Sequence, residues 1–152
     1  TTNQVRIGGQ QSYSALDVTG AIVATGTISG GSDERLKENI LTITGSEALD
    51  KLNELNPVTF DWKESYQTVT DVPSNYSGFL ASEYSIIFPE ATRKSRNDIY
   101  KNGDGTYRLG TKIQDGESLE VEDIKTIDPS IVIPYLVAAI KDLEARLKEV
   151  EG

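Results

Sequence analysis

The sequence predicts an α+β protein in three parts: a short β-rich fibrous segment at residues 1–31, a small mixed domain with short strands and helices, and a long C-terminal helix at residues 129–151. Three observations lead to this prediction. The composition changes at Ser32, short apolar runs alternate through the middle of the chain, and residues 128–152 carry a heptad pattern. The predicted domains are therefore 1–31 and 32–152.

Composition excludes several classes of function. The chain has 152 residues, with 15 Lys and Arg against 24 Asp and Glu, and its net charge of -9 disfavours nucleic-acid binding and attraction to anionic membranes. Because there is no cysteine, disulfides and thiolate sites are impossible. The absence of histidine excludes a Ser-His-Asp triad and imidazole-based zinc sites. We therefore expect no metal and no cofactor, and any catalytic base must be Lys, Asp, Glu or a terminal amine.

The N-terminal segment differs in character from the rest. Its run LDVTGAIVATGTISGG (residues 16–31) alternates short apolar residues with Thr, Ser and Gly. Short strands punctuated by glycine bury little surface on their own. The run is either a flexible linker or the end of a fibrous β-structure that becomes stable by winding with identical neighbours. Four apolar residues, which a linker would not need, favour the second reading: Val18, Ile22, Val23 and Ile28.

The middle of the chain predicts a helix followed by a strand. SEALDKLNEL (46–55) places three leucines on one helical face, with Ser46 as a candidate N-cap. Pro57 then ends the helix. The run PVTFDWK (57–63) alternates apolar and polar residues and therefore predicts a strand. The side chains that we expect on its buried face are Val58, Phe60 and Trp62.

Two further motifs complete the predicted mixed domain. SGFLASEYSIIFPEA (77–91) predicts a short strand and then a short helix that stops before Pro89. DIYKNGDGTYRLGT (98–111) predicts a hairpin whose turn contains Gly103 and Gly105. The acidic turn does not predict calcium binding, because the full carboxylate spacing and the closing Glu of a calcium loop are missing.

The C-terminal helix has the clearest periodicity. Its apolar residues recur at alternating spacings of three and four, which is the a/d pattern of a parallel coiled coil: Ile133, Leu136, Ile140, Leu143, Leu147 and Val150. The alternative is a single amphipathic helix that packs on its own domain. We expect the first half, with Val137, Ala138 and Ala139, to pack there, and the stripe in residues 143–151 to meet a partner helix. Because fewer than three heptads make a weak zipper, other contacts must contribute.

The run GGSDERLKENI (30–40) allows two interpretations. In the first, Ser32 or Asp33 caps a helix and Lys37 is solvated. In the second, Ser32 is a nucleophile and Lys37 its base. Residues five apart in a continuous helix point about 140° away from each other. The two side chains can meet only if Ser32 lies outside the helix, in a conformation that the two preceding glycines permit.

Beyond these patterns, the sequence resembles a known family. The run SDERLKENI, followed by ALDKLNELNPVTFDWK, GFLASEYSIIFPEA and DPSIVIPYLVAAIKDLEARL, is similar to the S74 peptidases. These are C-terminal intramolecular chaperone domains of phage tailspikes, tail fibres, endosialidases and neck appendages, and a related domain occurs in the myelin regulatory factor. The resemblance spans about residues 32–148.

The resemblance implies a self-cleaving homotrimer. Carried over by position, Ser32 would be the nucleophile, Lys37 the general base and Gly31–Ser32 the bond that is cut. Asp33 and Glu83 are possible supporting residues. The chain departs from the family where relatives commonly have Ala-Gln-Glu-Val, because Ser82 stands here in the glutamine position. Lysine acts as a base only when neutral, a state that burial away from carboxylates favours.

The expected function is therefore a chaperone that trimerises and registers a phage tail fibre or tailspike and then releases itself. Its partners would be two further copies and the upstream shaft of the same chain, with no nucleic acid and no membrane. The expected location is the virion, after assembly of the precursor in the host cytoplasm. The sequence runs unbroken across the Gly31–Ser32 bond. A trimerisation tip that is never cleaved therefore remains the alternative, whereas an enzyme with a diffusible substrate has little support.

Overall fold

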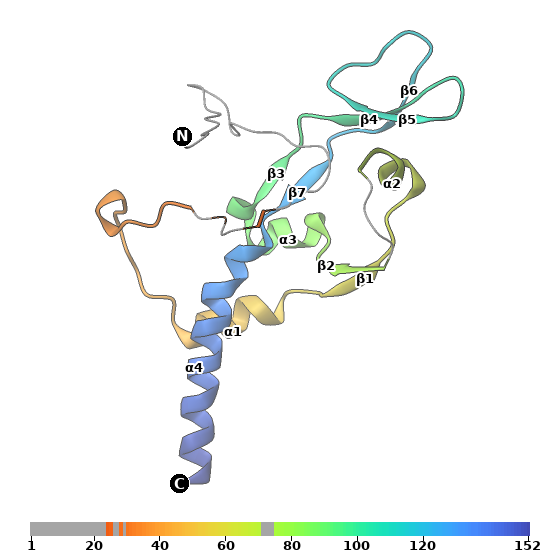
Figure 1. The fold of residues 1–152 in the computed structure, drawn as a ribbon. Coiled ribbons are helices and arrows are strands. Elements are labelled where there is room, and N and C mark those ends of the chain that lie inside the picture. Colours follow the sequence, from red (N-terminus) through yellow and green to blue (C-terminus); the bar gives the residue numbers. More distant parts are fainter. Residues whose placement is uncertain (1–23, 26–27, 29, 71–74) are drawn as a thin grey trace.

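Helix α4 (Val132–Glu151) leads from the body of the molecule to the C-terminus, and its C-terminal half projects away from the other elements (Figure 1). The computed structural model describes residues 24–25, 28, 30–70 and 75–152. Across these residues the fold is mixed α and β, with short strands in small sheets and a long last helix. None of the helices in these ranges is long and apolar enough to cross a membrane.

Helix α1 (Gly45–Asn53) packs against α4. The sequence predicted Ser46 as the N-cap of this helix, but the cap is Thr44, whose Oγ1 accepts a hydrogen bond from the Glu47 amide at 3.2 Å. The helix begins at Gly45, which approaches the side chain of Asp142 on α4 so closely that a Cβ there would overlap it. The expected helix ends before residue 55, yet Leu55 still packs on the core.

The core is aromatic and centres on helix α3 (Ala81–Ile87). Tyr84 and Phe88 are buried with their rings 5.4 Å apart, and Phe88 lies 5.1 Å from Tyr135 of α4. The Tyr84 hydroxyl donates to the carbonyl of Asp128 at 3.1 Å, so its polar end is satisfied. As predicted, α3 ends before Pro89, which begins the 3-10 turn η2 (Pro89–Ala91).

Two short antiparallel strands, β1 (Val58–Phe60) and β2 (Tyr76–Gly78), pair beside the core. The predicted strand at 57–63 is thus shorter than expected, and Trp62 lies outside it. The Trp62 ring instead packs 4.5 Å from Tyr66 of helix α2 (Glu64–Thr70), an element that the sequence patterns did not predict. Ring packing replaces ladder pairing at this position because the chain turns into α2 directly after the strand.

The remaining strands form a second pair and a three-stranded sheet. Strands β3 (Thr92–Lys94) and β7 (Lys125–Ile127) pair antiparallel. Beyond them lies the antiparallel sheet β5-β4-β6, built from β4 (Asp98–Lys101), β5 (Tyr107–Gly110) and β6 (Ser118–Val121). This sheet extends from the body on the side opposite to the end of α4 (Figure 1).

The predicted hairpin is confirmed, because β4 and β5 pair across the NGDG turn. Gly105 has φ +89°, a conformation that favours glycine. The Asp104 carboxylate accepts from the Thr106 amide at 2.9 Å, and the Asn102 amide donates to the Thr106 carbonyl at 2.8 Å. The acidic residue in this turn therefore stabilises the turn itself.

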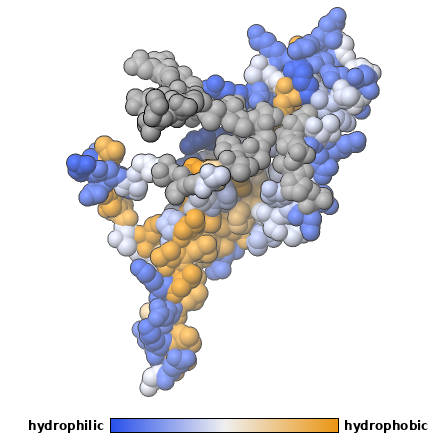
Figure 2. Space-filling model, in the orientation of Figure 1, coloured by the Kyte–Doolittle hydropathy of each residue, from blue (hydrophilic) through white to orange (hydrophobic). Residues whose placement is uncertain are grey.

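Helix α4 has two faces with different environments. Ala139 is buried, and Tyr135 packs on the aromatic core, so part of the first half packs on its own domain as predicted. Val137 does not, because it is exposed. The six residues of the heptad stripe are all exposed in the single chain: Ile133, Leu136, Ile140, Leu143, Leu147 and Val150. Figure 2 shows this apolar surface running down α4.

The predicted fibrous segment 1–31 lies largely outside the described residues. Those that are described there, 24–25, 28, 30 and 31, are not in a strand. The winding of this segment with identical copies therefore stays a prediction.

Candidate active site

Ser32 and Lys37 lie side by side at the start of the folded domain. The Lys37 Nζ donates a hydrogen bond to the Ser32 Oγ at 2.8 Å. A neutral lysine at this distance could accept the hydroxyl proton directly, which is the geometric requirement for a general base. The structure thus brings the predicted nucleophile and base together, and their catalytic roles stay predictions.

The two side chains meet because the helix between them is very short. The 3-10 turn η1 (Glu34–Leu36) has three residues, and both flanking residues, Asp33 and Lys37, have extended backbones. Ser32 and Lys37 therefore lie outside the turn, which brings their side chains back together. A regular α-helix over the same residues would have separated them.

Asp33 is the N-cap of this turn. Its carboxylate accepts from the Arg35 amide at 2.9 Å and pairs with the Arg35 guanidinium at 2.6 Å. These hydrogen bonds hold the pKa of Asp33 below its ordinary value. Asp33 thus orders the turn, and its charge is paired with Arg35, while its supporting role in catalysis stays a prediction. The sequence patterns did not predict the contact between Arg35 and Asp33. An arginine two residues after a capping aspartate could have indicated this ion pair.

The other predicted support, Glu83, lies in the first turn of α3. Its Oε2 accepts from the Asn56 side chain at 3.3 Å, and the hydrogen bonds recorded for the described residues do not join it to Ser32 or Lys37. In Figure 1, α3 lies in the body whereas the turn η1 lies at the end of a separate, extended segment. Glu83 is therefore not part of the Ser32–Lys37 site within one chain.

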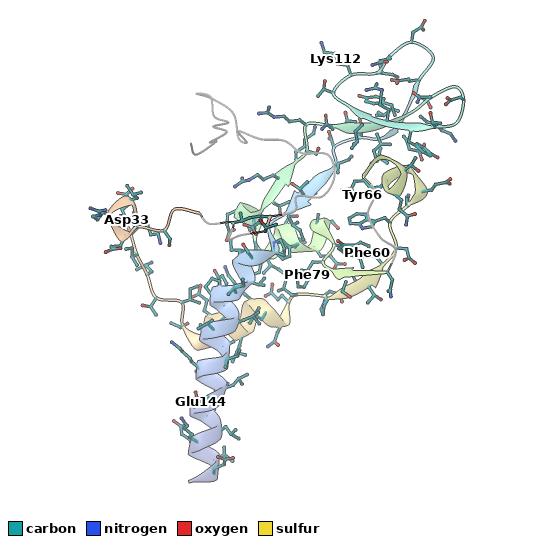
Figure 3. The ribbon with its side chains drawn as sticks, in the orientation of Figure 1. Asp33, Phe60, Tyr66, Phe79, Lys112 and Glu144 are labelled. Atoms are coloured by element: carbon teal, nitrogen blue, oxygen red, sulfur yellow. The ribbon has the colours of Figure 1, made fainter. Side chains whose placement is uncertain are left out.

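The extended segment, residues 32–44, is the arm of this molecule. It leaves the body at the start of α1 and carries η1, labelled by Asp33 in Figure 3, away from the core. Ser32 and Lys37 are both exposed there. Gly31, which precedes the predicted cleavage point, is also open: a Cβ added there would meet no described atom within 4 Å. The space beside the Gly31 Cα is thus open, and Lys37 is exposed in the single chain.

A separate groove lies in the body. It has a volume of about 640 Å³ and contains none of the predicted site residues in its lining. Phe60, Tyr66 and Phe79 line it, and Figure 3 places them on the side of the body away from the arm. The Trp62 Nε1 is buried with no hydrogen-bond partner among the described residues. The groove is apolar in character and distinct from the Ser32–Lys37 site.

A comparison with protein families gives a match that begins at the candidate nucleophile. Residues 32–93 match the S74 peptidase family, described as the chaperone of endosialidase. This segment is similar to the S74 chaperone family. The matched segment includes both candidate catalytic residues, the arm, α1, β1 and all of α3. The match supports an intramolecular chaperone role in general terms.

A relative of known sequence also aligns along most of the chain. An uncharacterized membrane protein of Dictyostelium discoideum is 26% identical over 160 aligned residues, which cover 98% of this chain and 8% of that protein. The chain thus spans a small part of the length of this relative. The chain is thus similar to one segment of a much larger protein, and the activity and partners of the whole protein are proposals.

Proposed function

We propose that this chain is an intramolecular chaperone that joins three copies of an upstream fibre and then releases itself by cutting its Gly31–Ser32 bond. The observation that carries the proposal is the contact between Lys37 Nζ and Ser32 Oγ at 2.8 Å, at the first residue of the S74 match. Serine hydroxyl is a poor nucleophile until a base removes its proton, and Lys37 is placed to remove it.

The proposed reaction is a transfer of an acyl group followed by hydrolysis. Neutral Lys37 takes the hydroxyl proton as Ser32 Oγ attacks the carbonyl carbon of Gly31. The peptide C–N bond breaks, the proton passes from Lys37 to the departing amine of Ser32, and an ester joins Gly31 to Ser32 Oγ. Water then hydrolyses this ester. The products are a shaft that ends in the Gly31 carboxylate and a domain that begins with the Ser32 amine.

The chaperone role follows from the physics of aligning three similar strands. A slip of one residue would exchange inward and outward side chains, and little in residues 1–31 specifies the register. A domain that associates first makes later pairing effectively intramolecular, at an effective concentration that reaches roughly the millimolar range. The exposed stripe on α4 supplies a surface for this association. Removal of the domain afterwards leaves the shaft kinetically trapped.

The upstream partner in this proposal is the shaft of a phage tail fibre or tailspike. The support is the description of the matched family as a chaperone of endosialidase. The proposed location is accordingly the virion, with the precursor assembled in the host cytoplasm and the released domain left outside the mature fibre.

Intact mass and oligomer size of the purified chain test the proposal. We expect a fragment that begins at Ser32, released from a trimer. Ser32→Ala and Lys37→Ala should remain full-length and trimeric. Lys37→Arg is the sharper variant, because arginine keeps the positive charge and donors but does not lose its proton in proteins. Efficient cleavage by the arginine variant would eliminate Lys37 as the base.

The alternative is a trimerisation tip that stays on the fibre without cleavage. The observation that favours it is the exposure of Lys37, because the single chain does not bury this side chain in the way that the proposed mechanism requires. A wild-type trimer that remains full-length on prolonged incubation would support this second function and reject the first.

A further inference from the structure

The arm carries large apolar side chains that its own chain does not cover. Leu36, Ile40 and Leu41 are 83%, 70% and 87% exposed. Burying a side chain of this kind is worth about 1.5–3 kcal/mol relative to leaving it in water. Three such residues lie within six positions of the arm, and Leu36 directly precedes Lys37.

Helix α4 presents a matching apolar face near its N-terminal end. In the heptad that places the stripe at a and d, Val137 falls at e, outside the coiled-coil seam. It is 48% exposed, whereas the two later e positions are occupied by Glu144 and Glu151. Val137 lies on one helical face with Ile133 and Ile140, at spacings of four and three. The upper end of α4 is thus apolar where the lower end is charged.

The arm starts beside this helix and is long enough to reach another one. Its last residue, Thr44, caps α1 directly before Gly45, which contacts Asp142 of α4. The eight residue-to-residue steps from Leu36 to Thr44 span at most about 28 Å when extended. Packed helices lie about 8–10 Å apart. The arm can therefore cross the distance to the α4 of a neighbouring copy.

We infer that the arm of one copy docks on the Val137 side of α4 in a second copy, at the edge of the a/d seam, through Leu36, Ile40 and Leu41. The arm does not dock on the α4 of its own chain, because these three arm side chains are exposed in the single chain. A second copy is the occupant because it supplies an apolar face that is also uncovered. This inference rests on the proposed trimer. It specifies which surfaces of two neighbouring copies are in contact.

Docking would complete the candidate active site from a neighbouring chain. Leu36 is adjacent to Lys37, so a helix packed over Leu36 removes water from one side of the Ser32–Lys37 pair. Lys37 is then exposed in the single chain because the α4 helix of the neighbouring copy, which would cover one side of the site, is absent. Assembly and cleavage are thereby coupled, since the base is shielded only when a second copy is in place.

A disulfide between two copies tests the docking without requiring cleavage. The chain has no cysteine, so every introduced thiol is unique. In a Ser32→Ala background, one chain carries Leu41→Cys, and a second chain with a tag of different size carries Val137→Cys. The two are co-expressed and oxidised. We expect a mixed crosslinked dimer on a non-reducing gel.

The control replaces Val137→Cys by Leu119→Cys on strand β6, where the side chain is similarly exposed at 47% but far from the arm (Figure 1). We expect no mixed dimer from this pair. A trimer by light scattering without the Val137 crosslink would overturn the arm docking and leave the proposed function intact. A solitary chain would overturn both.

Cleavage in mixed trimers gives a second, independent readout. Val137→Glu should trimerise through its intact seam but lose cleavage, while Ala145→Glu, which adds the same charge at the f position, should cleave. Mixing the Val137→Glu chain with a Ser32→Ala helper restores a wild-type α4 in trans. We expect the helper to rescue cleavage of the Val137→Glu chain. Absence of rescue in verified mixed trimers would reject docking between copies.

Discussion

At the residue scale, the candidate site depends on where one short turn begins and ends. Asp33 caps η1 through the Arg35 amide, and the extended backbone at Lys37 ends the turn three residues later. The sequence could state the condition for contact between Ser32 and Lys37, namely that Ser32 lies outside a helix. It could not show that the turn would be only three residues long, because capping residues are compatible with a turn of any length.

At Gly45, a single neighbouring side chain, that of Asp142, determines which residue fits. Glycine has a poor helix propensity, so Ala would favour helix α1 by up to about 1 kcal/mol from propensity alone. However, a Cβ at this position overlaps the Asp142 side chain near its own Cβ, which is not the flexible end of that side chain. Packing therefore decides against Ala here.

We predict that Gly45→Ala lowers the free energy of unfolding, by about 1–3 kcal/mol, because the overlap forces α1 and α4 apart. Denaturant unfolding followed by circular dichroism measures this change. The matched control is Gly103→Ala, where the nearest atom to an added Cβ is the Gly116 carbonyl oxygen at an ordinary 3.7 Å. Equal stability of the two variants would contradict close packing of α1 on α4.

At the element scale, patterns with strong local signals were predicted and elements that depend on distant partners were not. The helix at 45–53, the helix at 81–87 and the hairpin at 98–110 each carry their own caps, prolines or turn residues. Helix α2 has no apolar period, and Trp62 holds it by ring packing. Strands β3 and β7 pair although more than thirty positions separate them in the sequence, so no local pattern predicts them.

The connection between β5 and β6 illustrates an element held by one ion pair. The Arg108 guanidinium donates to both carboxylate oxygens of Glu117, at 2.7 and 2.6 Å, and the Gln114 amide donates to the same carboxylate at 2.7 Å. Arg108 also lies over the Tyr100 ring at 5.1 Å. The Glu117 side chain is only 5% exposed, so the pair fixes the loop against the sheet.

We predict that acid loosens this loop. The hydrogen bonds from Arg108 lower the pKa of Glu117 in the folded state. A carboxylate with a lowered folded pKa contributes stability above its ordinary pKa of about 4.3, and that contribution is lost as the pH falls through the lower folded value. Hydrogen-exchange protection of residues 111–117, corrected for intrinsic rates, should therefore decline below that ordinary value.

Glu117→Gln should show the same low protection already at neutral pH, because the amide cannot form the bidentate charged pair. The control is Glu120→Gln on the exposed face of β6, which should keep wild-type protection. Unchanged protection of the loop in Glu117→Gln would show that the pair does not hold it.

At the scale of the whole molecule, the single chain has a small core and a large exposed apolar surface. Among the described residues, few apolar side chains are buried: Ala48, Tyr84, Phe88, Ala91, Ile99, Tyr100 and Ala139. The α4 stripe and the arm, in contrast, leave large apolar side chains in water, as Figure 2 shows along α4. Contiguous exposed apolar surface of this kind is typical of an interaction site.

We predict that Leu143→Glu combined with Leu147→Glu yields a folded monomer. Both side chains are at least half exposed in the single chain, so the change should not disturb the core, but it places charges in the proposed seam. Light scattering coupled to gel filtration measures the mass, and circular dichroism checks the fold. Glu144→Gln, which removes only the surface pair with Lys148, should remain trimeric. A trimeric double variant would place the interface elsewhere.

The sequence by itself determined the composition limits, the heptad stripe, the locally coded helices and hairpin, and the pairing of Ser32 with Lys37 as a possibility, because each depends on residues close together in the chain. Only the tertiary structure decided that Val137 faces solvent, that Glu83 lies apart from the candidate dyad and that the arm stands free of the body. Those facts depend on which surfaces find a partner within one copy. The physical reason is that burial is a property of the packed molecule, whereas periodicity is a property of a short segment.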